Sequence, residues 1–161
     1  MNAAALRDAL IAWGSFYANH AAVRTLIAFV HVAALTTGGG AAIAADWRVL
    51  SSRRLDDATR RSRLSTLDSV HRVVTVGLVL IILSGLMMCA ADVETYLHSV
   101  VFWTKMALTA LLAVNGTILI MAGRRAAHAG DAWPLLRSTA LASLALWFLT
   151  TLAGVALPNI G

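Results

Sequence analysis

The residues with the greatest potential for chemistry lie inside long apolar stretches. His31 interrupts the run LIAFVHVAAL, and Lys105 interrupts a second run, FWTKMALTALLAVN. Ionisable side chains within hydrocarbon are costly and are therefore functional-site candidates. A neutral imidazole is a good ligand for haem iron or copper, and an ammonium group can pair with an anionic cofactor group. We therefore take these two residues as the first candidates for a cofactor site.

The composition indicates that such stretches are membrane-spanning helices. The chain has 161 residues, of which 59% are hydrophobic and only 13% are charged. Soluble domains are about 45–50% apolar and about 25% charged. We expect one all-α integral membrane domain, residues 1–161, with spans near 23–49, 67–91, 100–121 and 134–156. Each span is close to the ~20 residues that cross ~30 Å of hydrocarbon.

The first 22 residues predict a short helix outside these spans. Leu6, Leu10, Trp13 and Tyr17 recur at helical spacing. The basic start of a signal peptide is missing. We expect a helix that lies in the membrane interface and is anchored by its two aromatic side chains.

The distribution of charged residues predicts how the protein is oriented in the membrane. Six arginines lie between Arg48 and Arg63, after the first span, and Arg124 and Arg125 follow the third. The loop after the second span is acidic. The positive-inside rule then places the arginine-rich loops in the cytoplasm of a bacterial-type inner membrane, with both termini outside. The fold expected is an up-down four-helix bundle, and the formal charge of +5 gives no reason to expect nucleic acid as a partner.

Because a helix rises about 1.5 Å per residue, the position of a residue along its span indicates its depth in the membrane. Several candidates fall in the outer half. His31 lies about eight residues into the first span and Lys105 about five into the third, so their depths match. His98 precedes Lys105 by seven residues and is expected on the same helical face. The end of the second span adds three sulfur side chains to this half: Met87, Met88 and Cys89. His71 lies roughly 15–20 Å deeper than His31, so it would belong to a second site.

Each candidate has a structural explanation beside the functional one. His31 either hydrogen-bonds a neighbouring helix, ligates haem or another cofactor, or takes part in metal transport. Lys105 either extends to the interface or pairs with a haem propionate. His71 either pairs with Asp46 or Asp68 or belongs to a cofactor site. The three sulfur residues either pack in the bundle or bind Cu(I), which prefers soft ligands.

Small residues accompany His31 along its helix. Ala34, Gly38, Ala42 and Ala45 share or border its face, and Gly38 opens a glycine triplet. Such a face accommodates a porphyrin edge or a closely packed helix. Asn115, in the middle of the third span, is expected to hydrogen-bond across helices.

Three of these patterns together resemble a known superfamily. They are His31 in FVHVAAL before small residues, an arginine and a late glycine in HRVVTVGLVLIILSGLMM, and Trp-x-Lys opening FWTKMALTALLAVN. They are similar to four-helix proteins that include the copper resistance protein D family and membrane-embedded protoporphyrinogen IX oxidases, which bind haem b. The resemblance implies that His31 is a haem ligand and that Lys105 is functionally important. It covers spans one to three. The asparagine–glutamate–proline signature of the oxidases is missing from span four, so their activity is not implied.

The leading hypothesis is a small b-type haem protein of the membrane, acting in electron transfer or as a subunit of an oxidoreductase. His31 would be the axial ligand, Lys105 would pair with a propionate, and His98 would be a possible second ligand. The expected partner is quinone or a periplasmic redox protein. One alternative is copper handling through these histidines and the sulfur residues. Another is a cofactor-free accessory subunit of a larger membrane complex or homo-oligomer. No set of residues suggests hydrolytic chemistry.

Overall fold

The computed structural model describes residues 2–51, 67–129 and 132–160, and no strand occurs among them. The arginine-rich loop at 52–66 and Asp68 lie outside the residues whose side chains are described. The elements, in chain order, are α1 (Ala3–Asn19), α2 (Ala21–Ala34), the π-helical turn η1 (Leu35–Gly39), α3 (Gly40–Ser51), α5 (Leu67–Ala91), α6 (Val93–His98), α7 (Val100–Ala129) and α8 (Trp133–Ile160). Within these ranges, four stretches are long and apolar enough to cross a membrane. The chain is a multi-pass membrane protein, and the predicted all-α fold is confirmed.

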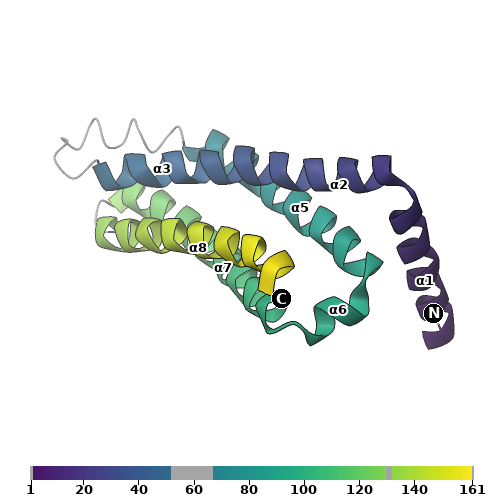
Figure 1. Ribbon diagram of the computed structural model, residues 1–161. Helices are drawn as coiled ribbons and strands as arrows, with labels where there is room; N and C mark the ends of the chain where they lie inside the picture. The colour runs from purple at the N-terminus through teal and green to yellow at the C-terminus, as the bar shows by residue number, and fades with distance from the viewer. Residues whose placement is uncertain (1, 52–66, 130–131, 161) are drawn as a thin grey trace.

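The four spans run alternately up and down (Figure 1). α2, η1 and α3 form one continuous helix, α5 returns beside it, and α7 and α8 form a hairpin. The N-terminal helix, α6 and the C-terminus lie toward one end, here called the terminal end. The end of α3, the start of α5, the end of α7 and the start of α8 lie at the other, here called the arginine-rich end because Arg48, Arg72, Arg124 and Arg125 lie there.

The spans pack as two pairs that meet at the arginine-rich end. α2 and η1 pack against α5, α7 packs against α8, and α3 joins the pairs by packing against α8. Figure 1 shows α5 diverging from α8 as it runs toward α6. Two buried clusters fill this interface. One is Ala45, Val49, Leu119, Ala122, Ala126, Leu136 and Ala140. The other is Ala34, Ala42, Ile81, Leu112 and Trp147.

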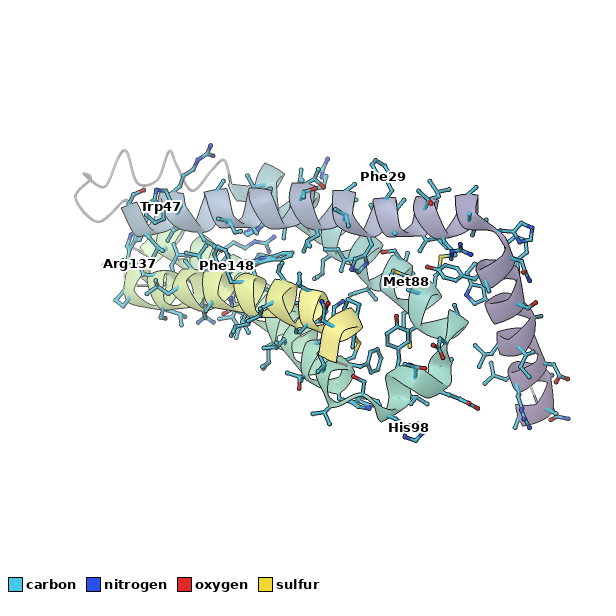
Figure 2. The ribbon with its side chains drawn as sticks, viewed as in Figure 1. Phe29, Trp47, Met88, His98, Arg137 and Phe148 are labelled. Carbon is cyan, nitrogen blue, oxygen red and sulfur yellow. The ribbon has the colours of Figure 1, made fainter. Side chains whose placement is uncertain are left out.

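Large apolar side chains cover the outside of the bundle. Phe29, which is 66% exposed, points away from α2 in Figure 2. Leu152 and Val155 are similarly exposed on α8. Side chains of this size and polarity are suited to acyl chains rather than water, so the outer surface is a lipid-facing surface.

The π-helical turn changes which neighbour the first span contacts. A Cβ atom at Gly38 would lie 3.0 Å from the Cα of Gly77 on α5, while one at Gly39 would lie 3.1 Å from the ring of Trp147 on α8. Two consecutive residues therefore face different helices. A π turn holds one extra residue, so the helix after it is rotated relative to the helix before it. Before η1 the span packs on α5. After η1 it packs on α8 as well, so the small residues serve helix packing on two sides.

The N-terminal helix forms as predicted and contacts the end of α5. The indole Nε1–H of Trp13 donates to the carbonyl oxygen of Met87 at 2.9 Å. A Cβ atom at Gly14 would lie 2.8 Å from the carbonyl oxygen of Ala91. Trp13 therefore anchors α1 to the protein itself, and Gly14 permits the close approach.

Candidate functional site

A hydrogen bond between two spans orients the ring of His31. Its Nδ1 lies 2.9 Å from the hydroxyl oxygen of Ser84 on α5. That hydroxyl is buried, and it lies 2.6 Å from the carbonyl oxygen of Leu80 and 3.2 Å from that of Ile81. A hydroxyl group has one proton, and carbonyl oxygens can only accept. We assign the hydroxyl proton of Ser84 to the carbonyl oxygen of Leu80, the shortest of these contacts, so that the oxygen of Ser84 accepts the Nδ1–H of His31.

This tautomer leaves the other ring nitrogen available. With the proton on Nδ1, Nε2 of His31 carries a lone pair, and no residue that the structure describes donates a hydrogen bond to it. The ring lies beside Gly85, where a Cβ atom would be in ordinary van der Waals contact with Cε1 at 3.5 Å. His31 can therefore fulfil both roles predicted for it. One ring nitrogen hydrogen-bonds α5, and the other keeps its lone pair for a ligand.

Lys105 approaches this histidine from the other helix pair. Its Nζ lies against Gly154 of α8, where a Cβ atom would be 3.4 Å away. The side chain is half-buried and has no acidic partner within the described part of the chain. Its charge acts electrostatically on His31. The structure thus brings the two residues that depth counting paired into the same region, and cofactor binding there stays a prediction.

His98 lies away from this region. It ends α6 and is exposed, and Figure 2 shows its side chain pointing away from the bundle. The prediction that His98 and Lys105 share one helical face is wrong because the chain turns at Ser99, whose backbone is extended. Ser99 then caps α7, accepting from the backbone N–H of Phe102 at 3.1 Å. A serine at this point is a helix-start signal that the spacing argument overlooked.

The other predicted ligands are distributed along α5. His71 lies in the second turn of α5, thirteen residues before Ser84, or about 20 Å along the helix. Met87, Met88 and Cys89 are consecutive on α5, so their side chains diverge by about 100° each. No group of three or more His, Cys, Asp or Glu side chains that could hold a metal ion occurs among the described residues. His71 is therefore too far along α5 to share a site with His31, and copper binding by the sulfur residues stays a prediction.

Ser84 is the functional candidate that sequence reasoning missed. It lies seven residues from the end of α5 at Ala91, and His31 lies ten residues from the start of α2 at Ala21. The depth argument applied to His31 and Lys105 could have found it. The predicted bond of Asn115 is present: its Nδ2 donates to the Thr139 carbonyl oxygen on α8 at 3.0 Å.

Comparison with known proteins gives one match. A family model described as a family of unknown function, DUF6644, matches residues 9–157. The match extends from within α1 to near the end of α8 and so includes all four spans. No curated protein and no solved structure matches the chain.

Proposed function

The chain belongs to the DUF6644 family, whose function is unknown, and we propose that it binds haem b through His31 and acts in electron transfer or as a membrane subunit of an oxidoreductase. The observation that carries the proposal is the hydrogen bond of His31 to Ser84. Histidines that ligate a metal almost always donate their other N–H to a fixed acceptor, which sets the tautomer and the ring orientation. His31 has this arrangement, with Nε2 left for the iron.

Lys105 supplies the second requirement of the site. Haem b has two propionate groups, and a charge-assisted hydrogen bond from an ammonium group would stabilise one of them. Lys105 is half-buried, close enough to act on His31, and has no acidic partner among the described residues. An unpaired cation in an apolar region is costly unless an anion accompanies it. The residues present therefore fit the group.

The chain's own residues would each have a defined task. A bound haem supplies reversible one-electron chemistry. His31 would ligate the iron, Ser84 would hold the imidazole, and Lys105 would neutralise a propionate and influence the reduction potential through its charge.

The membrane setting suggests the partners. The positive-inside rule supports a cytoplasmic arginine-rich end in a bacterial-type inner membrane, which would put the haem in the outer half of the bilayer. Quinone, which dissolves in the bilayer, or a periplasmic redox protein would then exchange electrons with it.

The visible spectrum of the protein, purified in detergent from cells supplied with haem precursor, tests the proposal. We expect a Soret band, and α and β bands after reduction, all of which His31→Ala removes. His98→Ala is the matched control, because His98 is exposed and points away from the bundle; it should retain the spectrum. A folded wild-type protein that stays colourless, also after titration with haemin, would overturn the proposal and leave the cofactor-free accessory subunit.

A further inference from the structure

Asp46 is a buried acidic residue that the haem proposal does not use. It lies on α3, five residues before the end of that helix at Ser51, and only 1% of its surface is exposed. Its helix neighbours Ala42, Ala45 and Val49 belong to the buried apolar clusters. The carboxyl group is therefore enclosed by the packing of α3 against α8 and α5.

The carboxyl group is only partly satisfied. The hydroxyl of Ser143 on α8 is its hydrogen-bonding neighbour, and Oδ2 has no hydrogen-bond partner. Three other ionisable side chains of the described residues lie toward the arginine-rich end on the helices packed against α3: Arg137 on α8, labelled in Figure 2, and His71 and Arg72 on α5. None of them hydrogen-bonds Oδ2, and the buried Nε of Arg137 has no hydrogen-bond partner of its own.

An ionised carboxylate in this position would be unstable. Transferring the charge from water into an apolar interior costs several kcal/mol per ion unless a counter-charge accompanies it. A metal cation would need several further oxygen ligands, and no cluster of three or more potential ligands occurs in the described part of the chain. A proton neutralises the same charge and requires only a carboxyl oxygen, and Oδ2 has no other partner.

We propose that Asp46 is a proton-binding site, holding an exchangeable proton on its carboxyl group at neutral pH. Oδ2 carries the proton, and Ser143 hydrogen-bonds the group. Asp46 lies about 7.5 Å along α3 from the arginine-rich end, so that end is the nearer one for exchange of the proton with solvent. The proton site does not depend on haem binding, since His31, Ser84 and Lys105 are not among the residues that act on Asp46.

One face of α8 contacts both Asp46 and Lys105. Ser143, Trp147, Thr150 and Gly154 follow one another at spacings of four, three and four residues and so share one face of α8. This face contacts Asp46 through Ser143 at one end and Lys105 through Gly154 at the other. Between them the buried Thr150 hydroxyl has no partner. Asp46 and Lys105 thus lie at opposite ends of one face of α8.

Infrared spectroscopy of the protein in lipid nanodiscs tests the site. At neutral pH we expect the C=O stretching band of a protonated carboxylic acid, which shifts in D2O and is lost in Asp46→Asn. Asp8→Asn, which changes an exposed acid on α1, should leave the band intact. Absence of the band in the wild type, its persistence in Asp46→Asn, or its loss on adding sodium ions would each overturn the proposal.

A second variant guards against misfolding of Asp46→Asn. Ser143→Ala keeps the acid but removes its hydrogen-bonding neighbour, so the band should remain and change frequency. An unchanged frequency in correctly folded Ser143→Ala would mean that the band comes from another acid, and the assignment to Asp46 would fail.

Discussion

Gly38 and Gly77 meet backbone to backbone, and this contact determines where His31 meets Ser84. A Cβ atom at Gly77 would lie 2.8 Å from the Cα of Gly38. His31 precedes Gly38 by seven residues and Ser84 follows Gly77 by seven, 38 − 31 and 84 − 77, on helices that run in opposite directions. The hydrogen bond therefore lies two helical turns from the crossing point on both helices.

Gly77→Ala is expected to destabilise the bundle and weaken this hydrogen bond. The added methyl group would press on backbone, which cannot move as a side chain can, and overpacking of this kind costs about 1–3 kcal/mol. Thermal unfolding in detergent measures the effect. Gly116→Ala on α7 is the control, since a Cβ atom there has nothing within 4 Å. Equal melting temperatures for the two variants would contradict the close crossing.

Ser84→Ala is expected to leave the fold intact and weaken haem binding. The variant removes the group that accepts from Nδ1 of His31, and loss of such a partner typically costs 10- to 100-fold in metal affinity or activity. Titration of the apoprotein with haemin measures the affinity. Thr104→Ala is the control, because that hydroxyl bonds only to its own helix at Val100. The role given to Ser84 fails if both variants bind haem as the wild type does.

Lys105→Met is expected to affect the apoprotein and the haem-bound protein in opposite directions. The ammonium group has no acidic partner among the described residues, so replacing it with an apolar side chain should leave the apoprotein as stable as before or more stable. With haem bound, loss of the propionate partner should weaken binding by roughly tenfold, or about 1.4 kcal/mol. Lys105→Arg should retain most of the affinity. Thermal unfolding and titration with haemin of both variants measure these effects. If the apoprotein of Lys105→Met is less stable than the wild-type apoprotein, Lys105 has a structural role instead.

Trp13→Phe is expected to loosen α1 from the bundle. It keeps an aromatic ring but removes the hydrogen bond to Met87, which is worth about 1 kcal/mol. Limited proteolysis should then cleave within α1 faster, while the spans stay protected. Unchanged cleavage would mean that the lipid interface alone holds α1. Leu6→Ala, at an exposed position of α1, should leave the cleavage rate unchanged.

The environment of the Tyr96 phenol predicts that the protein loses stability at alkaline pH. Burial raises the pKa of this phenol, and the nearby Cys89, Tyr17 and Asp92 raise it further. A pKa raised by folding means that the folded state favours the neutral phenol. The stabilisation is therefore complete below the ordinary tyrosine pKa of about 10 and is lost as the pH rises through the higher value. Tyr96→Phe should be less sensitive in melts at pH values around 9 to 12; identical alkaline losses in both proteins would exclude this role.

Hydropathy and charge were sufficient to predict the number of spans and their alternating direction. The second apolar span of the structure runs over Val70–Ala91, where a span near 67–91 was predicted. Depth counting also predicted similar depths for His31 and Lys105, because the rise per residue of a helix is constant, and the charge of Lys105 acts on His31 in the structure. These properties depend only on where residues lie along the chain, and a single sequence gives those positions completely.

The rotation of each helix about its axis required the tertiary structure. Nothing in LTTGG distinguishes a π turn from an α turn, yet this turn gives Gly38 to α5 and Gly39 to Trp147. The turn at Ser99 removed His98 from the face of Lys105, and packing against α5 supplied Ser84 as the partner of His31. In each case the outcome depends on contacts between helices, and these form only when the surfaces of two distant segments fit together.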